Sequence, residues 1–135
     1  MRGGVLLPAV ALLALAGCGT SATTGGAASC VGPQPALAPD RAAAGQQVTY
    51  TVEWLHGGCR DTDPSEEVEQ PLLDVRVEVV QGSGRAVVGT VSGTGEHFSG
   101  ALTFALPGWL RPGTADVVLR APIPEDLPFT VLPGP

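Results

Sequence analysis

Lysine is absent from the sequence, and basic residues of any kind are scarce. The 135 residues include 7 basic and 13 acidic side chains, which gives a formal net charge of −6. An acidic chain without a basic cluster is repelled by nucleic acid and by anionic lipid headgroups, because both carry dense negative charge. We therefore expect no nucleic-acid partner and no attachment to a membrane through surface charge.

Long hydrophobic runs are also absent. The apolar stretch at residues 5–16 is interrupted by Pro8 and is shorter than the roughly 20 residues that a membrane-spanning helix needs. It follows Met1 and Arg2, a short positive segment, as the apolar core of a signal peptide does. We interpret residues 1–17 as a signal peptide that directs the chain out of the cytoplasm.

A short motif ends this leader and predicts a lipid anchor. Leu15-Ala16-Gly17-Cys18 has the residue order of the bacterial lipobox, in which a diacylglycerol is attached to the cysteine thiol and the leader is cleaved just before it. Two acyl chains hold a protein on a membrane stably, whereas one does so only marginally. We therefore expect lipidation at Cys18 and a location on the extracytoplasmic face of the cell membrane. An ordinary secretory signal cleaved after Ala16 or Gly17, and an uncleaved anchor, are the alternatives.

Composition divides the remaining chain into a linker and one domain. Residues 19–29 contain no charge and no large apolar side chain, so residues 18–29 are expected to be the lipidated cysteine and a flexible linker. Such a linker reaches on the order of 20 Å. Residues 30–135 are long enough for one domain with a modest core.

Two cysteines remain once Cys18 carries lipid. Cys30 and Cys59 lie at equal distances from a turn expected at Ala44–Gly45, so an antiparallel strand pair around that turn would bring them together. Pairs of cysteines are usually bridged in an oxidising compartment, and a loop of this length gives a chain-entropy stabilisation of about 3–4 kcal/mol. We expect a Cys30–Cys59 disulfide, because a redox-active or metal-binding thiol pair would more often show CxxC spacing.

Alternation of apolar and polar residues predicts strands throughout the domain, and no segment has convincing helical periodicity. Seven short strands with one apolar face each, separated by turns rich in glycine and proline, are typical of antiparallel sheets packed face to face. The expected strands lie at residues 35–37, 47–55, 75–79, 86–91, 98–106, 115–120 and 129–131. The fold class is therefore an all-β antiparallel sandwich of about seven strands.

Two segments of this pattern resemble bacterial immunoglobulin-like domains. Residues 35–54 (PALAPDRAAAGQQVTYTVEW) are similar to the opening strands of such domains, and residues 110–119 with 129–131 are similar to their last hairpin. The whole layout resembles that of small actinobacterial lipoproteins with such a domain. The resemblance implies an immunoglobulin-like sandwich and a surface location, but no reaction, since this fold carries many functions. The Cys…Trp…Cys arrangement of antibody domains is not present.

The alternation also predicts which side chains face the core. We expect inward positions for Trp54, Val77, Phe104 and Val117, and outward positions for Glu53, Arg76, Thr103 and Asp116. Phe98, Leu102, Phe104 and Leu106 are expected to share one face, with an unfilled position at Gly100.

The densest charge lies in the segment after Cys59. Ca²⁺ binds carboxylate oxygens, and this segment offers those of Asp61, Asp63, Glu66, Glu67 and Glu69. A calcium-dependent binding module is therefore one alternative for the function. The spacing lacks the glycine and the final glutamate of an EF-hand loop, and runs of carboxylates are usually solvated. We expect no tight metal site and no cofactor.

Histidine and tryptophan provide the other candidates. His56 would need Cys59 as a free thiolate to bind a transition metal, and His97 has no nucleophile-elbow sequence near it, so an extracytoplasmic enzyme is the least favoured reading. Trp109 lies with Leu110 between Pro107-Gly108 and Pro112-Gly113. The two side chains either close the end of the sandwich, which we favour, or contact a partner.

The sequence therefore predicts a non-enzymatic, lipid-anchored protein of the cell envelope that serves as a binding or structural module. Its expected partners are the membrane, through the lipid, and a protein or envelope polymer whose identity the sequence does not specify.

Overall fold

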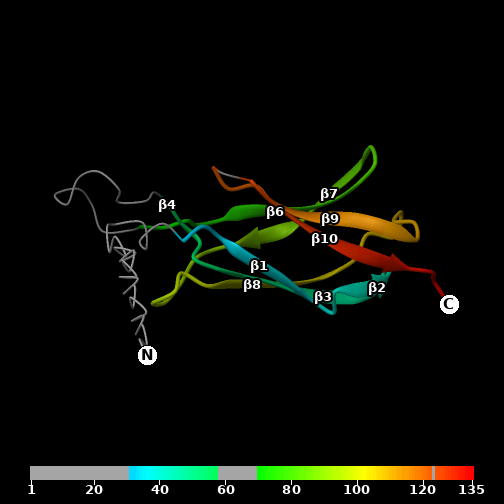
Figure 1. Ribbon diagram of the computed structural model, residues 1–135, viewed down its shortest axis with the longest axis horizontal. Coiled ribbons are helices and arrows are strands. Elements are labelled where there is room, and N and C mark those ends of the chain that lie inside the picture. Colours follow the sequence, from blue (N-terminus) through cyan, green and yellow to red (C-terminus); the bar gives the residue numbers. More distant parts are fainter. Residues whose placement is uncertain (1–30, 58–69, 123) are drawn as a thin grey trace, which may run out of the picture.

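The computed structural model describes residues 31–57, 70–122 and 124–135, and the alternating segments of this part of the chain form ten strands (Figure 1). Their bounds are β1 (Gln34–Ala38), β2 (Arg41–Ala43), β3 (Gln47–Glu53), β4 (His56–Gly57), β5 (Gln70–Pro71), β6 (Val75–Gln81), β7 (Gly84–Val91), β8 (Gly100–Ala105), β9 (Gly113–Leu119) and β10 (Glu125–Leu132). No helix is present among these residues, so the all-β prediction is confirmed.

The strands form two layers that face each other (Figure 1). One sheet has the order β1-β3-β8 and the other has the order β2-β10-β9-β6-β7, while β4 and β5 pair as a short two-stranded sheet. If β1 and β2 are counted as one divided strand, and the two-residue β4 and β5 are set aside, seven strands remain, at the positions expected from the sequence. Their order is compatible with an immunoglobulin-like sandwich, in which the second strand pairs with the fifth and the last strand adjoins the sixth.

The first strand divides at Pro39, and this division was not expected. β1 pairs antiparallel with β3, whereas β2 pairs parallel with β10 in the other sheet. Proline has no N–H group to continue a strand ladder, and the Ala38–Pro39 peptide bond, which is cis, lies at the crossing. The turn at Gly45 is present, but it joins strands of different sheets. The strand pairing that would bring Cys30 and Cys59 together places Gln34 opposite Leu55. The observed register instead pairs Gln34 with Glu53, a difference of two residues.

The core lies between the two sheets. Val77 and Val117 are fully buried and Phe104 is 8% exposed, as predicted. Of the predicted outward residues, Glu53, Arg76 and Thr103 are exposed and Asp116 is partly exposed. Leu106 is also buried, and Leu102 packs against the core. The period-two pattern therefore assigned the faces of the central strands correctly.

The inward assignment of Trp54 is wrong. Trp54 has a φ of 60°, in the left-handed region, which ends β3 and shifts the alternation by one residue. Leu55 takes the buried position instead, with 0% exposure. The Trp54 ring stacks on His97, with 4.8 Å between ring centroids.

Phe98 departs from the pattern for the same reason. It has a φ of 47°, lies before β8 rather than within it, and is only partly buried. Its carbonyl oxygen accepts a hydrogen bond from the Leu55 N–H at 3.1 Å. Phe98 therefore does not share the buried face of Phe104 and Leu106.

The space that a side chain at Gly100 would need is occupied by the backbone of Ser92. A Cβ atom there would lie 2.8 Å from the carbonyl oxygen of Ser92, just beyond β7. The two sheets thus approach each other closely at this point, and only glycine leaves room for that approach.

Candidate functional site

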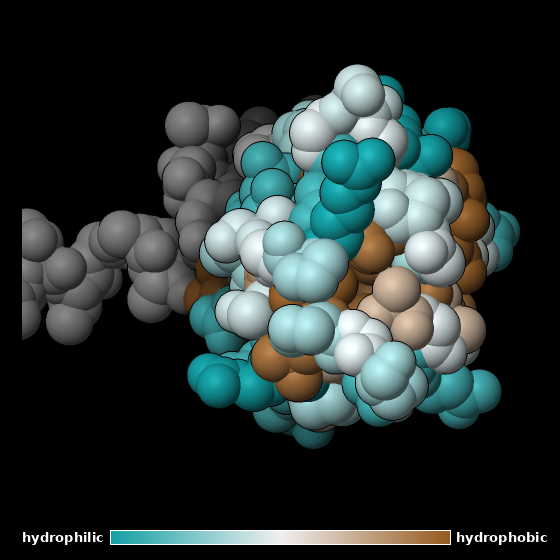
Figure 2. All heavy atoms as spheres, turned by 90° about the vertical axis from the view of Figure 1, so that its right-hand side faces the viewer, coloured by the Kyte–Doolittle hydropathy of each residue, from teal (hydrophilic) through white to brown (hydrophobic). Residues whose placement is uncertain are grey.

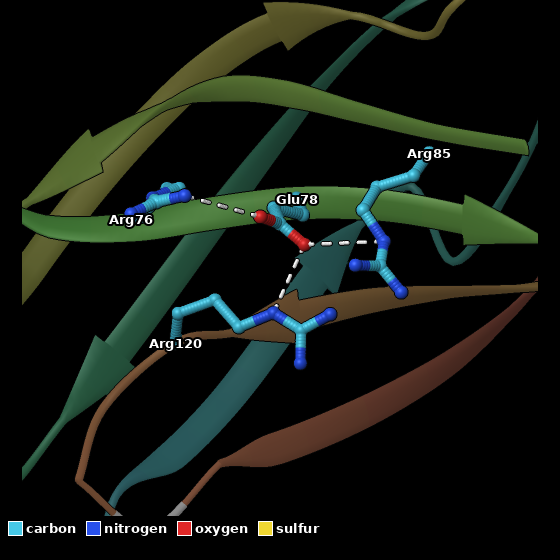
Figure 3. Close-up of polar contacts among 4 residues, drawn as sticks. All are labelled: Arg76, Glu78, Arg85 and Arg120. Carbon is cyan, nitrogen blue, oxygen red and sulfur yellow. Dashed lines mark hydrogen bonds and ion pairs between the residues drawn. The ribbon is translucent and has the colours of Figure 1, made fainter.

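A cluster of charged side chains lies on the outer face of the five-stranded sheet, and we call it the arginine cluster: Arg76, Glu78, Arg85 and Arg120. Strand alternation on β6 turns Arg76 and Glu78 away from the core, because Val77 and Val79 point into it. Arg85 comes from β7 and Arg120 directly follows β9, so three adjacent segments contribute (Figure 3).

Glu78 is the centre of this cluster. Its Oε2 accepts a hydrogen bond from Arg120 Nε at 2.9 Å and lies 3.7 Å from Arg85 Nε, while its Oε1 lies 3.7 Å from an Nη1 of Arg76 (Figure 3). The residue is 4% exposed. A buried carboxylate needs a partner of opposite charge, and Glu78 has three.

The arginines are more accessible than the carboxylate that they surround. The side chains of Arg76 and Arg85 are 59% and 62% exposed, and that of Arg120 is 34% exposed. One carboxylate balances one of the three guanidinium groups, so the cluster has two positive charges in excess. A guanidinium group has five N–H donors, and those of Arg76 and Arg85 are free to meet a second anion.

An exposed apolar residue adjoins the arginine cluster. Val87 on β7 is the cross-strand neighbour of Glu78 and is 57% exposed. Arginines beside exposed apolar side chains are typical of protein interaction surfaces. This face therefore has exposed cationic and apolar side chains next to each other.

The sequence predicted that Arg76 lies on the solvent-exposed face of its strand, but it did not predict the arginine cluster. The signal was present in the pattern Arg76-Val77-Glu78, which puts a cation and a carboxylate on one face of one strand. Recruitment of Arg85 and Arg120 depends on the registers of β6 with β7 and β9, which the sequence does not reveal.

Trp109 and Leu110 have different environments. Leu110 is 6% exposed and belongs to the core, so it is not available as a partner contact. Trp109 is 42% exposed and lies over the β6–β7 turn, where a Cβ atom on Gly84 would be 2.6 Å from its ring. The side-chain amide of Gln81 joins the same turn to the backbone of Arg111. Leu110 is thus part of the core at this end of the sandwich, whereas Trp109 covers the turn and stays partly exposed. That Trp109 contacts a partner stays a prediction.

The surface of that end is mixed rather than apolar. Figure 2 shows it as small hydrophobic areas separated by hydrophilic side chains, without one continuous apolar area in this view.

The histidines lie near each other at the opposite end from Trp109. His56 Nε2 is 3.0 Å from the carbonyl oxygen of Val31, and its ring is 5.5 Å from that of Phe98. A groove of about 910 Å³ is lined by β1, β3, β8 and the end of β7, and its lining includes Ser92 and Ser99 but not His97. The arrangement expected of a hydrolase is therefore not found among the described residues.

Several predicted site residues lie outside the described residues, and the predictions about them stay predictions. They are Cys18, Cys30, Cys59, Asp61, Asp63, Glu66, Glu67 and Glu69. Within residues 31–57, 70–122 and 124–135, no group of three or more histidine, cysteine, aspartate or glutamate side chains is placed to hold a metal ion. The same residues include no helix that is long and apolar enough to cross a membrane.

Comparison with known proteins adds no relative from which a function can be transferred. No protein-family model matches the chain, and no curated protein sequence matches it.

Proposed function

We propose that this protein is a non-enzymatic binding module, held at the extracytoplasmic face of the cell membrane by a lipid on Cys18, and that it binds its partner through the arginine cluster and Val87. The observation that carries the proposal is the excess of two positive charges around buried Glu78, next to an exposed valine, on a chain with a net charge of −6.

The N-terminal sequence supports the location. The leader, the lipobox and the uncharged linker form the order expected of a bacterial lipoprotein, and the all-β domain is compatible with the immunoglobulin-like domain that its sequence resembles. A tether on the order of 20 Å would let such a domain present one sheet face to a neighbour in the envelope.

Anchoring is tested by Cys18→Ser in the full-length chain. We expect the variant to leave the detergent phase and to incorporate no acyl label, because its only lipid acceptor is gone. Retention of acyl label by Cys18→Ser would overturn the anchor.

Binding is tested by a photo-crosslinking amino acid placed at Val87 in the membrane-anchored protein, in cells that produce it naturally. The matched control places the same amino acid at Ala105, which is exposed on the outer face of the three-stranded sheet. We expect one discrete adduct from position 87 and none from position 105. Equal adducts from both positions, or none from either, would refute a binding role for the arginine cluster.

A further inference from the structure

The arginine cluster has N–H donors left for further carboxylates. Arg76 lies on the strand next to Arg120, whose N–H donates to the Arg76 carbonyl oxygen at 2.8 Å, and like charges at neighbouring positions repel. Glu78 relieves part of this repulsion through its 2.9 Å bond to Arg120. Arg76 and Arg85 lie on opposite sides of Glu78 and are held only by contacts of 3.7 Å, so each has N–H donors left for short hydrogen bonds to carboxylates of a partner (Figure 3).

Negative charge on the same face directs an anion toward β7. The outward positions of β9 and β10 include Asp116 and exposed Asp126, on the side of β6 opposite to β7. The positive side of the face is therefore the part formed by β6 and β7. An acidic partner would approach over these two strands, because nearby charges act within about 10 Å at moderate salt.

The apolar side chains beside the arginine cluster indicate which class of anionic partner it binds. Val87 is 57% exposed at the position across from Glu78, and Val80, the cross-strand neighbour of Arg85, is partly exposed. A phosphate polymer needs the arginines but gains nothing from the valines. A protein segment with carboxylates beside apolar side chains satisfies both.

We infer that the arginine cluster binds an acidic segment of a partner protein, in which carboxylates meet Arg76 and Arg85 and an adjacent apolar side chain covers Val87. This inference rests on the proposed binding function and specifies the chemistry of the partner at the same site.

The experiment measures binding of synthetic peptides to the full-length chain carrying Cys18→Ser. The probe is a short peptide that alternates glutamate and valine, compared with a glutamine–valine peptide, a glutamate–serine peptide and inorganic polyphosphate. We expect the glutamate–valine peptide to bind tightest and its affinity to fall as salt is raised. Loss of the two exposed arginines in Arg76→Gln/Arg85→Gln should weaken this binding about tenfold, the value of two charge-assisted bonds in a partly exposed site.

Arg41→Gln is the matched control. Arg41 lies on β2, at the other edge of the same sheet, and its side chain is 68% exposed, so its loss removes the same kind of charge at a distance from the cluster. Arg120 is left unchanged because it makes the short bond to Glu78. We expect Arg41→Gln to bind the peptide as the parent does, and circular dichroism should show that all variants are folded.

Several results of the binding experiment would overturn the inference. They are equal binding of the glutamine–valine peptide, equal loss of affinity in Arg41→Gln, polyphosphate binding tighter than that of the glutamate–valine peptide, and self-association of the parent that Arg76→Gln/Arg85→Gln abolishes, since the last would make a second copy the occupant. A crosslink at position 87 without peptide binding would refute the acidic partner and leave the binding function standing. Arginine-dependent peptide binding without a crosslink at position 87 would overturn the proposed function in the cell, because no partner would then occupy the cluster there.

Discussion

Tyr50 is the residue whose chemistry depends most on its burial. It is 0% exposed in β3, and its hydroxyl group has no hydrogen-bond partner among the described residues. Burial raises the pKa of Tyr50 well above its ordinary value, and the carboxylate of Glu125 raises this pKa further. An unsatisfied buried hydroxyl group costs about 1–3 kcal/mol of stability.

We expect Tyr50→Phe to be at least as stable as the parent at neutral pH, by up to about 2 kcal/mol, because it removes the unpaired group. The free energy of unfolding, measured by urea titration, checks this. Destabilisation by more than about 1 kcal/mol would show that the hydroxyl group has a partner.

Alkaline pH should separate the two proteins. The tyrosine of the unfolded chain ionises near its ordinary pKa of about 10, whereas Tyr50 stays neutral in the fold. Ionisation therefore favours the unfolded chain, so the free energy of unfolding is unaffected by this group below that pH and falls above it. The chain has 1 tyrosine, so the absorbance of tyrosinate reports Tyr50 alone. We expect it to appear only as the parent unfolds, and the stability of Tyr50→Phe to lack this dependence.

Glu78 should matter for stability beyond its role in binding. Glu78→Gln removes the only carboxylate shown among three arginines and leaves their charges to repel one another. We expect a loss of about 1–3 kcal/mol in the free energy of unfolding. Glu53→Gln is the control, since Glu53 is exposed on the other sheet, and it should change stability by less than about 0.5 kcal/mol. Equal effects of the two substitutions would contradict this account of Glu78.

At the scale of the elements, Gly100 permits the close approach of β7 and β8. Gly100→Ala would bring a Cβ atom to 2.8 Å from the Ser92 carbonyl oxygen, and backbone must move to admit it. We expect a loss of about 1–3 kcal/mol. Gly108→Ala is the matched control, because a Cβ atom at Gly108 would meet nothing within 4 Å. Thermal melting of both variants measures the difference, and similar melting temperatures would contradict the close approach.

At the scale of the whole molecule, the predicted disulfide would join the cysteines on either side of the described range 31–57. The Val31 carbonyl oxygen lies 3.0 Å from His56 Nε2, so the residue after Cys30 contacts a residue three before Cys59. This contact supports the pairing, although the β1–β3 register ends at Gln34 and does not itself reach the cysteines.

We therefore expect mass spectrometry of the non-reduced protein to yield a peptide pair joined through Cys30 and Cys59. Reduction should lower the free energy of unfolding by about 3–4 kcal/mol, the chain-entropy value for such a loop. Two thiols that alkylate freely before reduction would refute the bridge.

The sequence by itself predicted the all-β class, the positions of seven strands and the faces of the central ones. The reason is that side chains alternate between the two faces of a strand, so a strand with one buried face shows an apolar residue at every second position. It did not predict the division of the first strand at Pro39 or the shift of phase at Trp54, since each depends on backbone pairing with a distant segment. The arginine cluster also depends on pairing between segments that are distant in the sequence. Its four residues come from β6, β7 and the end of β9, and only the registers between these strands surround Glu78 with three arginines and leave Val87 exposed beside them.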